Sequence, residues 1–84
     1  MHEIIFDEEA IDFLNTLPKE IKERIFKKIL STKDNPLHFF ERLTARSEYK
    51  LRVGDYRIIA DIDSAKKKVQ VTFVGHRKNV YDKI

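Results

Sequence analysis

The stretch YKLRVGDYRII, residues 49–59, has the residue alternation of a β-hairpin. Gly54 and Asp55 fit a two-residue turn, and such a turn sets the register of the two strands that it joins. In that register one face of the hairpin is apolar, and Arg52 lies directly opposite Arg57 on the other face. Like charges directly opposite each other destabilise a strand pair. The sequence therefore predicts a hairpin with a basic face that folding alone does not require.

The two faces of this hairpin predict two different surroundings. The apolar face, where Leu51 is opposite Ile58, must receive the helices, because a slip of one residue would bury the charges instead. The basic face also carries Lys50 and is therefore expected to be open to solvent. Its cations are either solvated and balanced by nearby acids such as Glu41 or Glu48, or they bind phosphate groups, whose oxygens suit the guanidinium fork.

The rest of the sequence predicts one α+β domain over residues 1–84. In chain order, the expected elements are a strand at residues 3–6, helices over 7–17 and 18–35, and strands over 49–53, 56–62 and 69–74. This β-α-α-β-β-β order is typical of a helical hairpin packed on one face of a small antiparallel sheet. Asp7 is expected to cap the first helix, and strict alternation places Val69, Val71 and Phe73 on one face of the last strand. These patterns leave the position of the first strand in the sheet open.

Composition excludes several classes of protein. The chain has no cysteine, which excludes disulfide scaffolds and thiolate metal sites, and its three histidines lack ligand spacing. No apolar run reaches the roughly 20 residues of a membrane span, and the start MHEIIFDEE lacks the features of a signal peptide. Lysine and arginine exceed aspartate and glutamate by 17 to 14, which suits a phosphate-rich or acidic partner. We therefore expect a cytoplasmic protein with no metal and no cofactor.

The predicted second helix has a polar face with five cations, Lys28 among them. Glutamates one turn before two of these cations are placed for intrahelical ion pairs. We interpret this face as a solvated helix surface, with contact to a polyanion as the alternative.

The segment YKLRVGDYRIIADID, residues 49–63, followed by VTFVGHRKNVYDKI, residues 71–84, resembles the RelE/ParE toxin superfamily, and within it the RelE branch. The resemblance covers essentially the whole chain. It implies a RelE-like toxin of a toxin–antitoxin pair that acts as a ribosome-dependent endoribonuclease, or mRNA interferase. Such a toxin cuts mRNA in the ribosomal A site by attack of the ribose 2′-hydroxyl, without a metal, and inhibits translation. The implied partners are the ribosome with its mRNA and a RelB-like antitoxin, acidic or amphipathic, that wraps the toxin.

The resemblance also implies a set of site residues. Arg57 matches an arginine that holds the scissile phosphate, and Arg77 matches a second active-site arginine. Tyr81 matches a tyrosine that stacks on or positions a nucleotide. Lys50 matches a lysine of the catalytic strand, and Arg52 a basic neighbour.

The group that takes the hydroxyl proton is left open at this stage. Glu48 stands where some ribosome-dependent members carry a further lysine, and other branches use a glutamate or a histidine in acid–base work. The base is therefore either Lys50 or a carboxylate such as Glu48. His76 is a further candidate, but its side-chain direction after Gly75 is not fixed by alternation.

Two other functions compete with mRNA cleavage. Within the superfamily, ParE-like members poison DNA gyrase instead of cutting RNA. Outside it, a small basic domain can hold RNA or an acidic protein without chemistry. The set of Lys50, Arg52, Arg57, Arg77 and Tyr81 favours the nuclease.

Overall fold

The computed structural model of the chain describes residues 1–44 and 46–76. In chain order the elements are β1 (Glu3–Phe6), α1 (Glu8–Leu14), α2 (Lys19–Ser31), α3 (Pro36–Phe39), β2 (Glu41–Arg42), β3 (Tyr49–Val53), β4 (Tyr56–Asp63) and β5 (Lys68–His76). The α+β class is confirmed, and the predicted order holds apart from α3 and β2, which lie between the second helix and the hairpin. None of the helices in these two ranges combines the length and the apolar character needed to cross a membrane.

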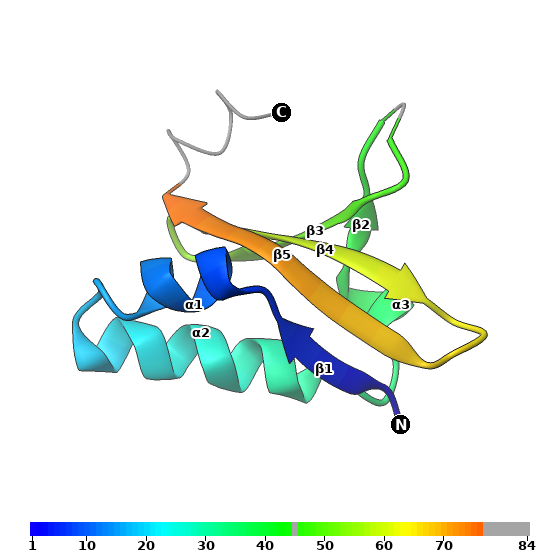
Figure 1. The fold of residues 1–84 in the computed structure, drawn as a ribbon, viewed down its shortest axis with the longest axis horizontal. Coiled ribbons are helices and arrows are strands. Elements are labelled where there is room, and N and C mark those ends of the chain that lie inside the picture. The colour runs from blue at the N-terminus through cyan, green and yellow to red at the C-terminus, as the bar shows by residue number, and fades with distance from the viewer. Residues whose placement is uncertain (45, 77–84) are drawn as a thin grey trace.

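The five strands form one sheet in the order β1-β5-β4-β3-β2 (Figure 1). Neighbouring strands from β5 to β2 are antiparallel, but β1 runs parallel to β5, with Ile4 beside Val69. The sheet is therefore antiparallel as predicted except at this edge, where β1, whose position the sequence left open, runs parallel to β5. No tight turn joins β1 to β5, since three helices and three strands separate them in the chain, so their relative direction is not restricted to antiparallel.

The β3–β4 hairpin has the predicted register. Arg52 is the partner of Arg57, and Leu51 is the partner of Ile58. Gly54 has a φ of +58° while the residue after it keeps a negative φ, which is the pattern of a type II′ turn. The twist of this turn matches that of the strands it joins, so the turn and the alternation together fix which side chains share a face.

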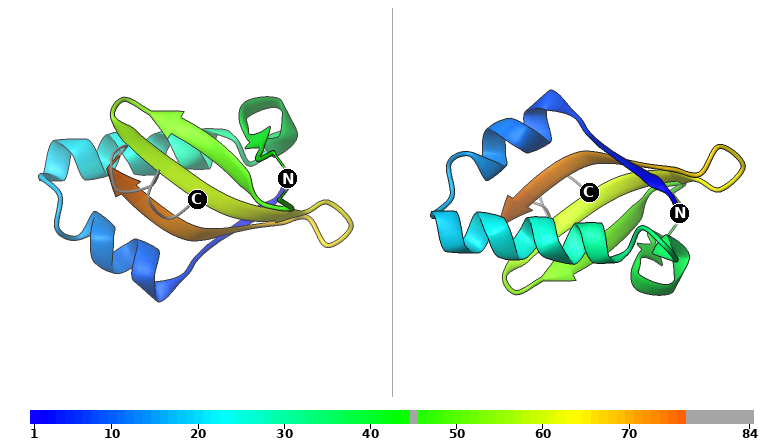
Figure 2. Two further views of the ribbon diagram at one scale, coloured as in Figure 1. Left: turned by 90° about the horizontal axis from the view of Figure 1, so that it is seen from above. Right: turned by 90° about the horizontal axis from the view of Figure 1, so that it is seen from below.

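Helices α1 and α2 cover one face of the sheet, which we call the helix face (Figures 1 and 2). The side chains with no exposed surface there are Ala10 and Leu14 of α1, Ile25 and Ile29 of α2, and Ile58, Ala60, Val69 and Val71 of the strands. These residues form one hydrophobic core between the helices and the sheet. The core therefore holds the apolar side of the hairpin, as its alternation predicts.

Asp7 lies at the start of α1 as expected, but its side chain makes no capping hydrogen bond. Its Oδ1 instead accepts a hydrogen bond of 2.6 Å from Gln70 Nε2 on β5. The carboxylate thus links the β1–α1 junction to the neighbouring strand, and the prediction of a side-chain cap is wrong.

A β-bulge changes the expected faces of β5. Ile59 pairs with Phe73, whereas the next residue of β4 pairs with Val71, so Thr72 is an extra residue on β5. Thr72 Oγ1 donates a hydrogen bond of 3.3 Å to the Ile59 carbonyl at this point. Beyond the bulge the alternation is reversed, and Val74 instead of Phe73 joins the core. The prediction that Phe73 shares a face with Val71 is therefore wrong.

Candidate functional site

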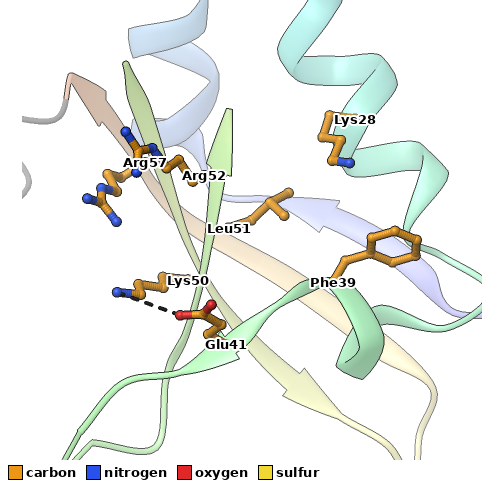
Figure 3. Close-up of a pocket in the computed structure, with 7 residues that line it drawn as sticks. All are labelled: Lys28, Phe39, Glu41, Lys50, Leu51, Arg52 and Arg57. Carbon is orange, nitrogen blue, oxygen red and sulfur yellow. Dashed lines mark ion pairs between the residues drawn. The ribbon is translucent and has the colours of Figure 1, made fainter. Parts of the chain in front are cut away.

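The sheet face opposite the helices carries three cations, and we call it the basic face. These cations are Lys50, Arg52 and Arg57. Strand β3 carries Lys50 and Arg52 two residues apart, and β4 places Arg57 directly opposite Arg52. Figure 3 shows the two arginine side chains together, with Lys50 on the same side of β3. The alternation of two adjacent strands thus gathers three cations within a few residues.

Arg57 is largely buried, with 8% of its surface exposed, whereas Arg52 is exposed. The partner of Arg57 on β5 is Gly75, which has no side chain to place beside the arginine. The bulge at Thr72 sets this register. Ile59, the next residue of β4 on this face, is only 3% exposed. The prediction of an open basic face is therefore only partly correct: Arg52 on β3 is exposed, whereas Arg57 and Ile59 on β4 are buried. Burial strengthens the attraction between a guanidinium and an anion, because little water screens it.

Lys50 lies beside a carboxylate of the edge strand. Glu41 of β2 is its partner in the register, and Lys50 Nζ is 3.9 Å from Glu41 Oε2. The Glu41 side chain is 78% exposed, so this ion pair contributes little to stability. Glu41 nevertheless balances one of the three cations, as the first interpretation of the basic face expected.

A pocket of about 430 Å³ lies at the edge of the sheet beside β3 (Figure 3). Its lining combines the three cations of the basic face with side chains from α2, α3 and β2. The lining residues are Lys28, Phe39, Glu41, Lys50, Leu51, Arg52 and Arg57. Within the described residues, β2 pairs with only Tyr49 and Lys50 of β3, so the edge of β3 beyond them borders the pocket. The volume is in the range of about 300–1,000 Å³ that holds a small ligand.

Two predicted site residues lie away from this pocket. Glu48 forms an ion pair of 2.8 Å with Arg46, and its carboxylate is not part of the pocket lining. His76 is the partner of Tyr56 across β4 and β5, and the two ring centroids are 5.5 Å apart, edge to face. Tyr56 packs on Phe13 of α1, with 6.3 Å between ring centroids, so His76 lies on the helix side of the sheet.

Arg77 and Tyr81 lie outside the described residues. Their predicted place in the site rests on the sequence resemblance, and they remain predictions. The geometry available for the site is therefore that of Lys50, Arg52 and Arg57 with their pocket neighbours.

Besides Leu51, which was predicted for the apolar face of the hairpin, three pocket residues were not predicted as site residues. Lys28 belongs to the polar face of α2, which was interpreted as solvated. Glu41 was considered only as a balancing acid. Phe39 and Glu41 reach the pocket through α3 and β2, which have four and two residues and are too short for a periodic pattern. No pattern in the sequence separates Phe39 from its neighbour Phe40, which is buried.

This arrangement suits the stabilisation of a negatively charged group. The two guanidinium groups can hold phosphate oxygens, and Lys50 adds a third positive charge. Lys50 and Glu41 are also groups that can transfer protons, and they lie within 4 Å of each other. In the parts of the chain that the structure describes, no three side chains of His, Asp or Glu are grouped to bind a metal ion.

Comparison with protein families finds one match. The model described as ParE toxin of type II toxin–antitoxin system, parDE, matches residues 4–81 of the chain. No curated protein sequence matches the chain.

Several solved structures share this fold. The RelBE2 toxin–antitoxin complex of Mycobacterium tuberculosis contains a chain with a TM-score of 0.83 and 24% identity, over 90% of this chain and 98% of that chain. The intact RelBE complex of E. coli gives a TM-score of 0.77 and 23% identity, over 90% and 96%. The isolated RelE toxin of E. coli gives 0.77 and 24%, over 99% and 94%. At these identities the likeness shows the fold alone.

Proposed function

Because the chain belongs to the ParE toxin family of type II toxin–antitoxin systems, within the RelE/ParE superfamily, we propose that this toxin is a ribosome-dependent endoribonuclease of the RelE kind. In this proposal it binds in the ribosomal A site, cuts the mRNA there and so inhibits translation. The ribose 2′-hydroxyl attacks the neighbouring phosphate and the bond to the 5′-oxygen breaks. The products are a 2′,3′-cyclic phosphate and a 5′-hydroxyl, and no metal takes part.

The observation that carries this proposal is the gathering of Lys50, Arg52 and Arg57 around one pocket. In the pentacovalent transition state the phosphate carries more negative charge than in the substrate. Cations that are already in place stabilise that state more than the substrate, and this effect is usually the largest single contribution to catalysis. Arg52 and Arg57 lie opposite each other and repel in the free protein. An anion bound between them would reduce this repulsion, so the basic face is suited to an anion.

We assign the roles as follows. Arg57, the buried cation, holds the scissile phosphate, and the exposed Arg52 contacts the same or the next phosphate. Lys50, in its uncharged amine form, takes the proton of the 2′-hydroxyl and becomes a cation as the phosphate gains negative charge. The leaving 5′-oxygen takes up a proton from water or a nearby acid to give the 5′-hydroxyl. Arg77 and Tyr81 complete the site by their match to the family, Arg77 at the phosphate and Tyr81 at a base.

The partners in this proposal are the ribosome and an antitoxin. The solved structures with this fold include toxin–antitoxin complexes of RelE with RelB, which supports an antitoxin partner for this chain. An acidic or amphipathic antitoxin would cover the basic face and exclude RNA from it. An adjacent reading frame that encodes such a protein is the cheapest check on this partner.

Primer extension on mRNA from a translation reaction tests the proposed activity. We expect breaks within the reading frame that appear only when ribosomes and the toxin are both present. Full inhibition of translation with intact mRNA would contradict cleavage and would favour a binding module.

Gyrase poisoning is the second candidate, since the family model that matches the chain is described as ParE toxin. It predicts trapped complexes of gyrase with cleaved DNA and no breaks in mRNA. The cations of the basic face favour RNA cleavage, because phosphoryl transfer without a metal needs positive charge at the phosphate. Both assays on the same purified toxin separate the two functions.

Substitutions at Lys50 and Glu41 identify the general base. We expect Lys50→Ala to lower the single-turnover rate of mRNA cleavage on ribosomes by about 100- to 10,000-fold, the usual contribution of such a group. Glu41→Gln is expected to stay within about threefold of the natural rate, because this exposed carboxylate only balances the lysine. The measurement is cleavage of a ribosome-bound mRNA with toxin in excess.

Lys50→Arg is the matched control, because arginine keeps the charge but does not take a proton at neutral pH. Full activity of Lys50→Arg would show that only the charge of Lys50 matters. A large loss in Glu41→Gln with an active Lys50→Ala would assign the base to Glu41 instead.

A further inference from the structure

Phe39 is a pocket residue that folding does not explain. Its neighbour Phe40 is 4% exposed and belongs to the hydrophobic core, whereas Phe39 is 38% exposed and lies outside that core. The ring of Phe39 lines the same pocket as Lys50, Arg52 and Arg57. An apolar ring kept at the edge of a basic pocket is suited to a ligand that has both an anionic and an aromatic part.

Two neighbouring side chains hold the Phe39 ring. Lys28 Nζ of α2 lies 5.2 Å from the ring centroid, as in a cation–π contact. The His38 ring packs edge to face against it, with 4.9 Å between centroids. The ring is therefore positioned before any ligand arrives, and Lys28 adds a positive charge beside it.

Figure 3 shows how these groups are arranged around β3. The Lys50, Arg52 and Arg57 side chains lie on one side of the strand, and Phe39 and Lys28 lie on the other side, next to Leu51. The pocket joins the two sides around the edge of the strand. A single nucleotide has the same division, with a phosphate at one end and a flat base at the other.

We propose that Phe39 and Lys28 form a subsite for an unpaired RNA base, next to the phosphate site of the three cations. This inference rests on the proposed function, since it assumes that the phosphate in the pocket belongs to RNA. The base stacks on Phe39, and Lys28 lies beside the adjoining backbone. Proteins that bind single-stranded nucleic acids combine aromatic rings with cations in this way, and the stacking tolerates any base.

A tryptophan at position 39 reports directly on stacking, because the chain contains no other tryptophan. The Phe39→Trp toxin is titrated with a short single-stranded RNA, 2′-O-methylated so that it cannot be cut, and with an abasic strand of equal charge. We expect the RNA to quench the tryptophan fluorescence and the abasic strand to bind without quenching. In parallel, Phe39→Ala is expected to weaken binding of the RNA about tenfold, as for the loss of one stacked base.

Two control variants accompany this titration. Phe39→Tyr keeps the ring and should bind the RNA like the natural protein. Leu37→Ala removes the neighbouring half-exposed side chain of α3, which does not line the pocket, and should leave RNA binding unchanged. RNA that binds to Phe39→Trp, as judged by the anisotropy of a labelled strand, without quenching its fluorescence would overturn the proposal.

The outcomes separate this subsite from the activity. Base-dependent quenching without cleavage on ribosomes would support the subsite and contradict the endoribonuclease. Cleavage that is unaffected in Phe39→Ala, with unchanged RNA affinity, would contradict the subsite alone. A natural protein that binds no free RNA would overturn the subsite, and cleavage on ribosomes would still decide the endoribonuclease. Loss of antitoxin binding in Phe39→Ala with intact RNA binding would contradict the subsite and assign the ring to the protein interface.

Discussion

Replacement of Arg57 by alanine is expected to lower the rate of mRNA cleavage on ribosomes by about 100- to 1,000-fold, the effect of losing one preorganised contact to a developing oxyanion. Arg57 is the strongest candidate for this effect because only 8% of its surface is exposed. Little water screens its charge, so its attraction to a phosphate exceeds that of an exposed cation. The measurement is the single-turnover rate of cleavage, with toxin in excess over programmed ribosomes.

Two variants control for charge and position. Arg57→Lys keeps the positive charge but loses the planar fork, so we expect a rate between those of alanine and arginine. Arg52→Ala removes the opposed but exposed arginine, and its loss should be about tenfold or less. Because Arg57 is buried, thermal unfolding of each variant must show that the toxin is folded at the assay temperature. A folded Arg57→Ala toxin that cuts within threefold of the natural rate would remove Arg57 from the site.

The hairpin could be predicted from the sequence because its determinants are local. A glycine in a two-residue turn sets the register, and alternation then assigns each side chain to a face. The pairing of Arg52 with Arg57 and the position of Lys50 on the same face follow from these two rules. The placement of these three cations on one face is therefore what a single sequence predicts well.

The bulge in β5 could not be predicted, because one extra residue in a strand leaves no mark on the pattern of residue types. Threonine is an ordinary residue type for a strand, yet the bulge at Thr72 reverses the face to which each later side chain of β5 points. The reversal brings Gly75 beside Arg57 and turns His76 to the helix side of the sheet. One irregular position thus decides which C-terminal strand residues can reach the basic face.

The remaining pocket residues depend on tertiary arrangement. Lys28 comes from α2, Phe39 from α3 and Glu41 from β2, and no spacing in the sequence relates them to the hairpin. They meet because the short segment after α2 returns the chain to the edge of β3. The direction of β1 beside β5 is likewise set by packing across the whole chain.

A substitution at Ile58, the residue next to Arg57, is expected to lower stability and to leave the site unchanged. Ile58 faces the helices, has no exposed surface and belongs to the core, while Arg57 points to the basic face. We expect Ile58→Ala to lower the free energy of unfolding by about 2–5 kcal/mol, through lost apolar burial and the cavity that remains. For a domain of this size the melting temperature should fall by on the order of 10–25 °C.

This loss is a large fraction of the stability of so small a domain, which is about 4–13 kcal/mol at the usual values per residue. Urea denaturation followed by circular dichroism measures it, and Ile58→Val, which removes one methylene, should cost only about 0.5–1.5 kcal/mol. Below its melting temperature Ile58→Ala should cut mRNA within a few-fold of the natural rate, since the cations of the basic face are unchanged. If Ile58→Ala instead lowered the rate as much as Arg57→Ala while the protein stayed folded, the two faces of β4 would not have separate roles. The contrast between these two neighbours therefore tests whether one strand divides folding and phosphate binding between its faces.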